Sequence, residues 1–126
     1  EAFIQEARSA LPDEFLAKHS AMYAKAWESI EVNYIFVRRD LEKNVESCVK
    51  TGMLGQRTRE EMQSILISHH EVMDRVWREH GGVNVYTDEL INGNYDSIKE
   101  AIEYCGISYN EEIVKDFVSP DLWHYK

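Results

Sequence analysis

The chain has 126 residues, of which 44% are hydrophobic and 11% aromatic, and a formal net charge of −9. This length and this hydrophobic content exclude a disordered chain and predict a single domain over residues 1–126. The acidic excess disfavours nonspecific binding to nucleic acid or to an acidic membrane surface. One anionic ligand stays possible, because a local basic pocket can form on an acidic protein.

Cysteine usage and hydropathy predict a cytoplasmic protein. Cys48 and Cys105 lie in predicted helices without metal-ligand spacing, which is typical of buried, reduced thiols. No signal-peptide pattern occurs, and no apolar run approaches the roughly 18–20 residues that cross a bilayer. The chain begins at Glu1 without a methionine, so we expect a trimmed or processed product, or a fragment of a longer protein.

The first half of the chain predicts helices followed by one strand. Apolar residues at helical spacing occupy residues 2–10 and, after Pro12, residues 13–29, although a loop at 18–20 is an alternative for the middle of the second helix. A β-branched and aromatic run at 33–38 then predicts a buried strand.

Another helix is predicted at 41–50, and it ends in a loop that contains Gly52 and Gly55. The longest predicted helix, roughly 59–80, begins with a capping box of Thr58 and Glu61. The residues on its predicted core face are Met62, Ile65, Leu66, Val72, Met73, Val76 and Trp77.

The remaining residues predict a second strand and two more helices. Gly81 and Gly82 end the long helix, and residues 83–87 have strand character. A turn is expected at 88–94, after which Asp96 is predicted to cap a helix that reaches Tyr104. Asn110 is predicted to cap a last helix, which stops before a proline.

This order predicts a helix-rich α/β fold with about five to six helices around a short parallel sheet. A strand–helix–strand crossover favours parallel pairing. Two parallel strands are too few for a self-sufficient sheet, since such sheets are normally wider and covered on both faces. We therefore expect either further strands from missing sequence or a partner chain, or stability that comes from helix packing.

Arg38 and Arg39 end the first predicted strand, and Ser47 lies eight residues after Arg39 on the next helix. The carboxyl ends of parallel strands are where open α/β sheets bind ligands, and a guanidinium near a helix N-terminus favours phosphate. The spacing brings Ser47 toward the same crevice. The alternative is a surface arginine paired with Asp40 or Glu42 and a serine without a role.

The run Tyr-Ile-Phe-Val-Arg-Arg-Asp-Leu at 34–41, followed by Ser47, resembles the segment that holds the 3′-phosphate of the cofactor in PAPS-dependent sulfotransferases. Residues 83–91 are similar to the family's later strand and acidic-Leu turn, and residues 96–107 to its following helix. Residues 117–125 resemble the C-terminus of small bacterial or phage-type members.

The resemblance covers roughly residues 33–126 and implies the C-terminal part of a P-loop-like sulfotransferase fold. It implies transfer of a sulfonate from PAPS to a hydroxyl or amine, on a small-molecule or glycan acceptor, without a metal. By position, Arg39 and Ser47 would bind the 3′-phosphate of PAPS or of the product adenosine 3′,5′-bisphosphate, with Arg38 adjacent. A guanidinium suits this role, because it is always charged and directional.

Two family features are missing or altered. The family's glycine-rich phosphosulfate loop has no counterpart, since no glycine precedes Gly52, so the chain holds only the 3′-phosphate-binding half of the site. A Lys-Thr-His step often precedes the family's arginine strand, whereas Lys18 and His19 here lack the threonine. His19 is the candidate general base, and the alternative is an ordinary half-buried histidine.

Other polar and aromatic residues favour structural interpretations. His69, His70 and His80 lack the spacing of metal ligands, so no metal site is predicted. The tryptophans are expected to anchor the core, at Trp27, Trp77 and Trp123, and the aromatic tail at 122–125 to dock on it.

Two further functions stay open. The absent glycine-rich loop favours a noncatalytic interaction module, derived from the same fold, that dimerises through the long helix and the aromatic tail. A regulator that binds a nucleotide phosphate without chemistry is the third possibility. In each case we expect no nucleic-acid or membrane partner and a possible homo-oligomer.

Overall fold

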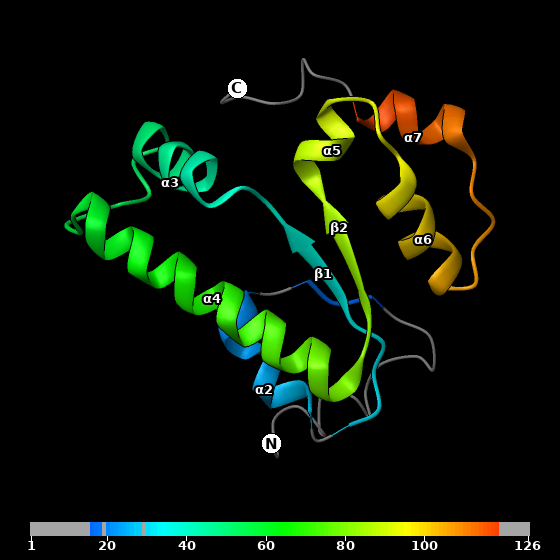
Figure 1. The fold of residues 1–126 in the computed structure, drawn as a ribbon, viewed down its shortest axis with the longest axis horizontal. Helices are drawn as coiled ribbons and strands as arrows, with labels where there is room; N and C mark the ends of the chain where they lie inside the picture. The colour runs from blue at the N-terminus through cyan, green and yellow to red at the C-terminus, as the bar shows by residue number, and fades with distance from the viewer. Residues whose placement is uncertain (1–15, 19, 29, 119–126) are drawn as a thin grey trace.

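The computed structural model describes residues 16–18, 20–28 and 30–118. Its elements run in chain order as η1 (Ala21–Tyr23, a 3-10 helix), α2 (Ala24–Trp27), β1 (Ile35–Arg38), α3 (Leu41–Lys50), α4 (Arg59–His80), β2 (Val83–Tyr86), α5 (Thr87–Ile91), α6 (Asp96–Tyr104) and α7 (Glu111–Phe117) (Figure 1). The helix-rich α/β class is confirmed. Predictions for residues 2–10, His19, Trp123 and the tail lie outside the described residues.

β1 and β2 pair in parallel, and the register runs from Ile35 opposite Val83 to Arg38 opposite Tyr86. The crossover through α3 and α4 provides the long connection that parallel pairing needs. Side chains alternate along each strand, and paired residues of parallel strands point to the same side. One face of the sheet therefore carries Phe36, Arg38, Asn84 and Tyr86.

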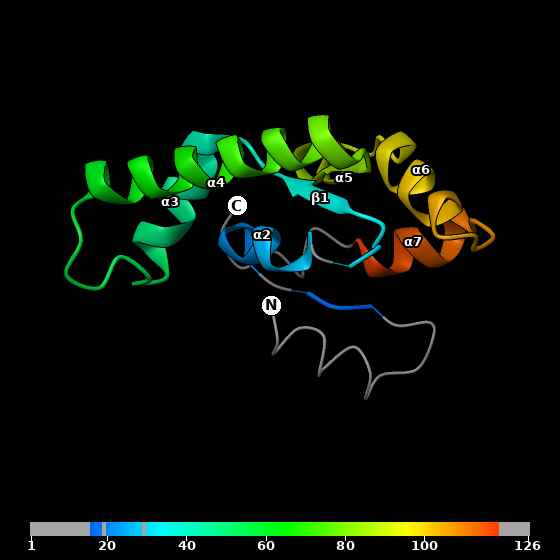
Figure 2. The same cartoon turned by 90° about the horizontal axis from the view of Figure 1, so that it is seen from below.

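The helices flank this small sheet on several sides. Helix α4 runs beside β1, whereas α5, α6 and α7 gather on the side of β2 (Figure 1). In the view turned by 90°, α2 and α7 lie on the opposite side of β1 from α4 (Figure 2). This arrangement leaves the carboxyl ends of both strands between α3, α4 and α5.

Three small apolar clusters form the core of the described chain. The first joins α3 to α4 through Val45, Cys48, Met62 and Leu66. The second joins β2 to α5 and α6 through Val83, Val85, Leu90 and Ala101. The third joins α2, β1 and α4 through Ala24, Phe36 and Val76. Helices contribute to all three clusters, so helix packing supplies much of the burial that a two-stranded sheet cannot.

The predicted caps are confirmed at two helices and wrong at a third. The Thr58 hydroxyl accepts a hydrogen bond from the backbone N–H of Glu61 at 3.1 Å, and the Asn110 side chain caps α7. Asp96, however, is the first residue of α6, and its N–H donates to the Asn94 side chain at 3.0 Å.

The expected turn at 88–94 is largely helical, because α5 covers Thr87–Ile91. Two observations explain this short helix. Its first turn carries Asp88 and Glu89, which favour a helix N-terminus, and Leu90 is buried in the second cluster. The turn proper follows α5, where the N–H of Gly93 donates to the Leu90 carbonyl at 3.1 Å.

The helix predicted at 13–29 is confirmed only over residues 21–27 of the described chain. Residues 16–18 and Ser20 are not helical, and helical structure covers only η1 and α2, as the loop alternative at 18–20 implied. Leu16 is 89% exposed, whereas Ala24 is the buried residue of this segment. The apolar spacing predicted a longer helix than the one that forms, because the four-residue α2 is too short to bury apolar side chains over several turns.

Two expected core residues are exposed. Trp77 is 44% exposed, because it lies at the rim of a polar pocket rather than inside the third cluster. Cys105 is exposed because α6 ends at Tyr104 and the chain turns at Gly106, whereas Cys48 is buried as predicted.

Candidate functional site

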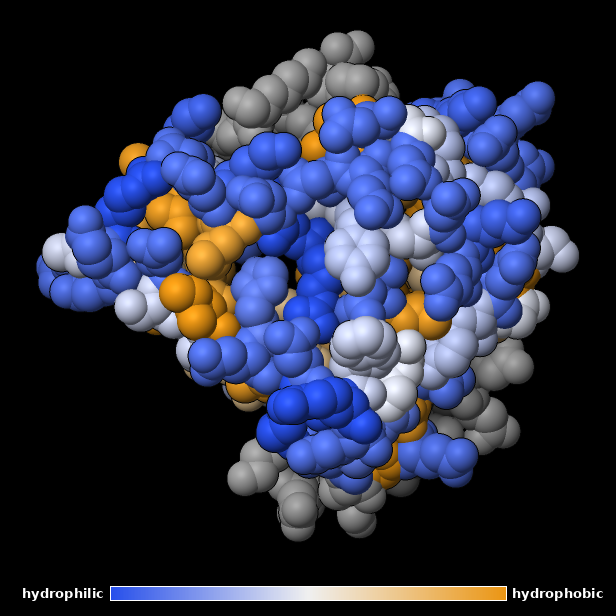
Figure 3. Space-filling view, in the orientation of Figure 1, coloured by the Kyte–Doolittle hydropathy of each residue, from blue (hydrophilic) through white to orange (hydrophobic). Residues whose placement is uncertain are grey.

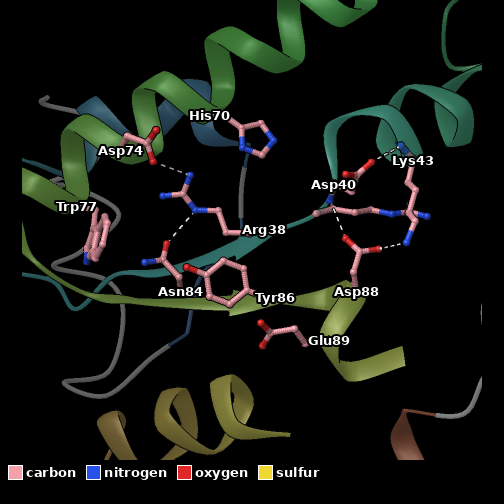
Figure 4. A pocket seen from close by; sticks show the side chains of 11 residues that line it. Arg38, Asp40, Lys43, His70, Asp74, Trp77, Asn84, Tyr86, Asp88 and Glu89 are labelled. Carbon is pink, nitrogen blue, oxygen red and sulfur yellow. Dashed lines mark hydrogen bonds and ion pairs between the residues drawn. The ribbon is translucent and has the colours of Figure 1, made fainter. Parts of the chain in front are cut away.

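An open pocket of about 560 Å³ lies at the carboxyl ends of the two strands, between α4 and the sheet. The space-filling view shows a hollow in the middle of this face, with strongly hydrophilic side chains inside it (Figure 3). The strand ends, the starts of α3 and α5, and one side of α4 supply its lining (Figure 4). The lining residues are Arg38, Arg39, Asp40, Lys43, His70, Asp74, Trp77, Asn84, Tyr86, Asp88 and Glu89.

Arg38 forms part of the pocket wall and is held by two fixed partners. Its Nε donates to Asn84 Oδ1 at 2.8 Å, and its Nη1 lies 2.9 Å from Asp74 Oδ1 (Figure 4). Its guanidinium carbon also lies 5.7 Å from the ring centroid of Phe36. The side chain is only 11% exposed, so this pairing meets the rule that buried charges are compensated. Arg38 thereby links α4 to β2.

The N-terminus of α3 is occupied by two carboxylates. Asp40 caps the helix, since its Oδ1 accepts from the backbone N–H of Lys43 at 3.0 Å. Asp88 reaches the same place from α5: its Oδ2 accepts from the Asp40 N–H at 2.7 Å, and its Oδ1 lies 3.3 Å from Lys43 Nζ (Figure 4). An anion at the positive end of a helix is favourable, and here the protein supplies its own.

Two hydroxyl groups fix the ends of the strands beside the pocket. The Thr87 Oγ1 donates to the carbonyl of Arg38 at 2.9 Å, and the buried Ser97 Oγ accepts from the Tyr86 N–H at 3.1 Å. Strand ends leave backbone groups without ladder partners, so such bonds are needed where these ends are shielded from water. The first bond ties β1 to α5, and the second ties β2 to α6.

The pocket lining carries nearly balanced charge. Three basic side chains face four carboxylates, those of Asp40, Asp74, Asp88 and Glu89. Two aromatic side chains also line it, Trp77 and Tyr86, which are 44% and 43% exposed. An anionic ligand would therefore meet local cationic donors, flat apolar surfaces and competing carboxylates together.

The predicted site residues are only partly brought together. Arg38 and Arg39 both line the pocket. Ser47 is not among the lining residues: it lies on α3 one turn beyond Lys43, and its carbonyl accepts from the Thr51 hydroxyl at 2.9 Å. His19 lies outside the described residues.

The sequence groups Lys43 with Arg38 and Arg39 in its densest basic cluster near an apolar run, whereas Asp88 was given no role. Asp88 follows the second strand closely, much as Arg39 follows the first, and parallel strands bring their carboxyl ends to the same edge.

A second polar cluster lies at the C-terminal end of α4. Side-chain atoms of Glu28, Glu79 and His80 that could ligate a metal ion lie within 4.8 Å of one another. Sequence spacing did not indicate this set. Arg75 joins this cluster, with Nη1 at 3.0 Å from Glu28 Oε1 and at 2.9 Å from Glu79 Oε2. The arginine compensates both carboxylates, so the arrangement is an ion-pair cluster.

Comparison of the chain with protein-family models, with curated proteins and with solved structures finds no match in any of the three. Within the described ranges, no helix joins the length of a membrane span to the apolar character that spanning requires.

Proposed function

We propose that this chain binds the 3′-phosphate end of PAPS, or of adenosine 3′,5′-bisphosphate, as half of the cofactor site of a sulfotransferase-like protein. One observation carries the proposal. At the carboxyl ends of two parallel strands, one pocket combines Arg39 and Lys43, neither of them buried, with the half-exposed rings of Trp77 and Tyr86. A nucleotide offers the matching pair of groups, an anionic phosphate and a flat base.

Different pocket residues would bind the phosphate and the base of the nucleotide. Arg39 provides a directional guanidinium and Lys43 a compact charge, both near the positive end of α3. The aromatic rings give apolar surface against which a base can stack. Arg38 adds positive charge to the pocket wall while bonded to Asp74 and Asn84. Ser47 is assigned to the 3′-phosphate by the resemblance alone, since it lies outside the pocket lining.

Sulfonate transfer is proposed for the whole protein, with PAPS as donor and a small-molecule or glycan acceptor. An acceptor oxygen or nitrogen attacks the sulfur in line, the bond from sulfur to the bridging phosphate oxygen breaks, and adenosine 3′,5′-bisphosphate leaves. The acceptor proton passes to a base, for which His19 is the candidate by resemblance. The phosphosulfate-binding part would come from another segment or partner. Free thiols at Cys48 and Cys105 support the proposed cytoplasmic location.

The test is calorimetric titration of adenosine 3′,5′-bisphosphate into the wild type and into Arg39→Ala. We expect the variant to lose at least about tenfold in affinity, since it removes a charge-assisted contact to phosphate. Arg59→Ala is the matched control, because Arg59 pairs with Glu46 and does not line the pocket. Absence of binding to the wild type, or equal losses in both variants, contradicts the proposal.

A second candidate function is a noncatalytic module that self-associates through helices. The observation that favours it is the outer side of α7, where Ile113 and Phe117 are 55% and 77% exposed and lie four residues apart. Sedimentation equilibrium of the wild type and of Phe117→Glu tests it. A dimeric wild type and a monomeric variant support this function, whereas a monomeric wild type contradicts it.

A further inference from the structure

Asp88 uses both of its carboxylate oxygens on the donors that a ligand phosphate would need. Oδ2 accepts from the Asp40 N–H at the start of α3 at 2.7 Å, and Oδ1 lies 3.3 Å from the Lys43 ammonium. Amides at helix N-termini and basic side chains are the usual partners of phosphate in proteins. The Asp88 side chain is 23% exposed, whereas that of Lys43 is 60% exposed. The carboxylate is thus partly enclosed, and the lysine faces solvent.

The other partnered carboxylates of the pocket do not contact the Lys43 ammonium or the Asp40 N–H. Asp40 caps the helix that it begins, and Asp74 pairs with Arg38 in the pocket wall. Asp88 instead comes from α5 and crosses to α3, 48 residues from Asp40 and 45 residues from Lys43 in sequence. Its contacts therefore depend on the position of α5 relative to α3.

We infer that Asp88 is a built-in competitor of the ligand phosphate at the N-terminus of α3. This inference rests on the proposed function, because it concerns regulation of the same site. A bound phosphate would need the donors that Asp88 holds, and two anions sharing these donors would repel each other. Binding therefore requires Asp88 to withdraw from Asp40 and Lys43. An anion that cannot take the place of Asp88 at both the Asp40 N–H and the Lys43 ammonium is excluded from the N-terminus of α3.

The distinguishing experiment compares Asp88→Asn with the wild type in calorimetric titrations of adenosine 3′,5′-bisphosphate. Asparagine keeps an oxygen that can accept from the Asp40 N–H but removes the charge that holds Lys43. We expect binding to tighten about five- to tenfold in this variant, because the internal anion no longer opposes the ligand. The matched control is Glu42→Gln, which removes one negative charge from the first turn of α3 outside the pocket lining. We expect it to change the affinity less than about twofold.

A measurement on the wild type avoids dependence on the folding of any variant. In amide NMR spectra, the Asp40 N–H should show one of the largest shifts on titration with adenosine 3′,5′-bisphosphate, because its acceptor changes. An Asp40 resonance that stays in place while the ligand binds overturns the competitor role.

The outcomes separate this inference from the proposed function. If the wild type binds and Asp88→Asn binds no more tightly, the competitor role is wrong and the proposed function stands. Tightening by Glu42→Gln as large as that by Asp88→Asn also overturns the role, since general electrostatics would then be the cause. If no variant binds, Asp88→Asn included, both proposals fall.

Discussion

The two ends of the parallel strand pair are built in opposite ways. At the amino end, a Cβ on Gly82 would lie 2.6 Å from the Tyr34 carbonyl oxygen, and the Tyr34 ring stacks on Phe36 with centroids 5.7 Å apart. At the carboxyl end, Arg38 and Asn84 border an open polar pocket. Close contact at the amino end holds the short sheet together, whereas charged and polar groups occupy the carboxyl end.

The largest expected effect comes from filling the close contact at the amino end. Gly82→Ala should lower the free energy of unfolding by about 3 kcal/mol, since it meets the Tyr34 carbonyl and a φ of +119°. Gly93→Ala is the control, because Gly93 also has a positive φ, of +87°, but nothing lies within 4 Å of its added Cβ. We expect Gly93→Ala to lower the free energy of unfolding by about 1 kcal/mol. Urea denaturation measures both, and equal losses would mean that the contact is not tight.

An intermediate effect is expected at the carboxyl end. Arg38→Met should lower the free energy of unfolding by about 2 kcal/mol, because it removes the bonds to Asn84 and Asp74. Lys43→Met should cost less than about 1 kcal/mol, since its exposed pair with Asp88 is screened by water. Urea denaturation again decides. A loss for Lys43→Met as large as that for Arg38→Met would contradict the distinction between a structural and an available cation.

The smallest effect is a pH dependence at Tyr34. Burial, and secondarily the charge of Glu28, raise the pKa of Tyr34 above its ordinary value of 10.0. The folded state therefore favours the neutral phenol, and this contribution to stability is present below about pH 10 and is lost as the pH rises above it.

Thermal unfolding at pH 8 and pH 11 checks this sign. The wild type should lose more stability between the two values than Tyr34→Phe, which cannot ionise there. At pH 8 the substitution should be nearly neutral, because the hydroxyl is buried without a hydrogen-bond partner among the described residues. Tyr23→Phe, at an exposed position, should retain the wild-type loss. An identical loss in Tyr34→Phe and the wild type would show that the phenol does not contribute.

The sequence predicted the elements that carry strong local signals. The capping residue Thr58 and the long apolar pattern behind it located α4, and the β-branched runs located both strands. The weak elements were misplaced for a physical reason. α2 is four residues long and α5 five, so neither is long enough to repeat an apolar pattern over two helical turns, and the burial of Ala24 and Leu90 comes from tertiary contacts.

The site was predictable in place but not in detail. The carboxyl edge of the strands follows from parallel pairing, and Arg38 and Arg39 were assigned to it correctly. Which arginine would turn inward depended on the register with β2, because that register brings Asn84 next to Arg38. Parallel pairing places Asp88 at the same edge, but its bonds to Asp40 and Lys43 depend on the tertiary position of α5, on which local sequence gives no information.

The bonds at the carboxyl edge also carry a consequence for how the chain folds. Arg38 to Asn84, Asp40 to Asp88, Lys43 to Asp88, and Thr87 to Arg38 join residues 45 to 49 positions apart. Such long-range links form only after a long loop has closed, which makes them late events in folding. The pocket should therefore appear after the α3–α4 hairpin has formed. A proteolytic cut between α3 and α4 would therefore break the long-range bonds of the carboxyl edge, even where each helix keeps its structure.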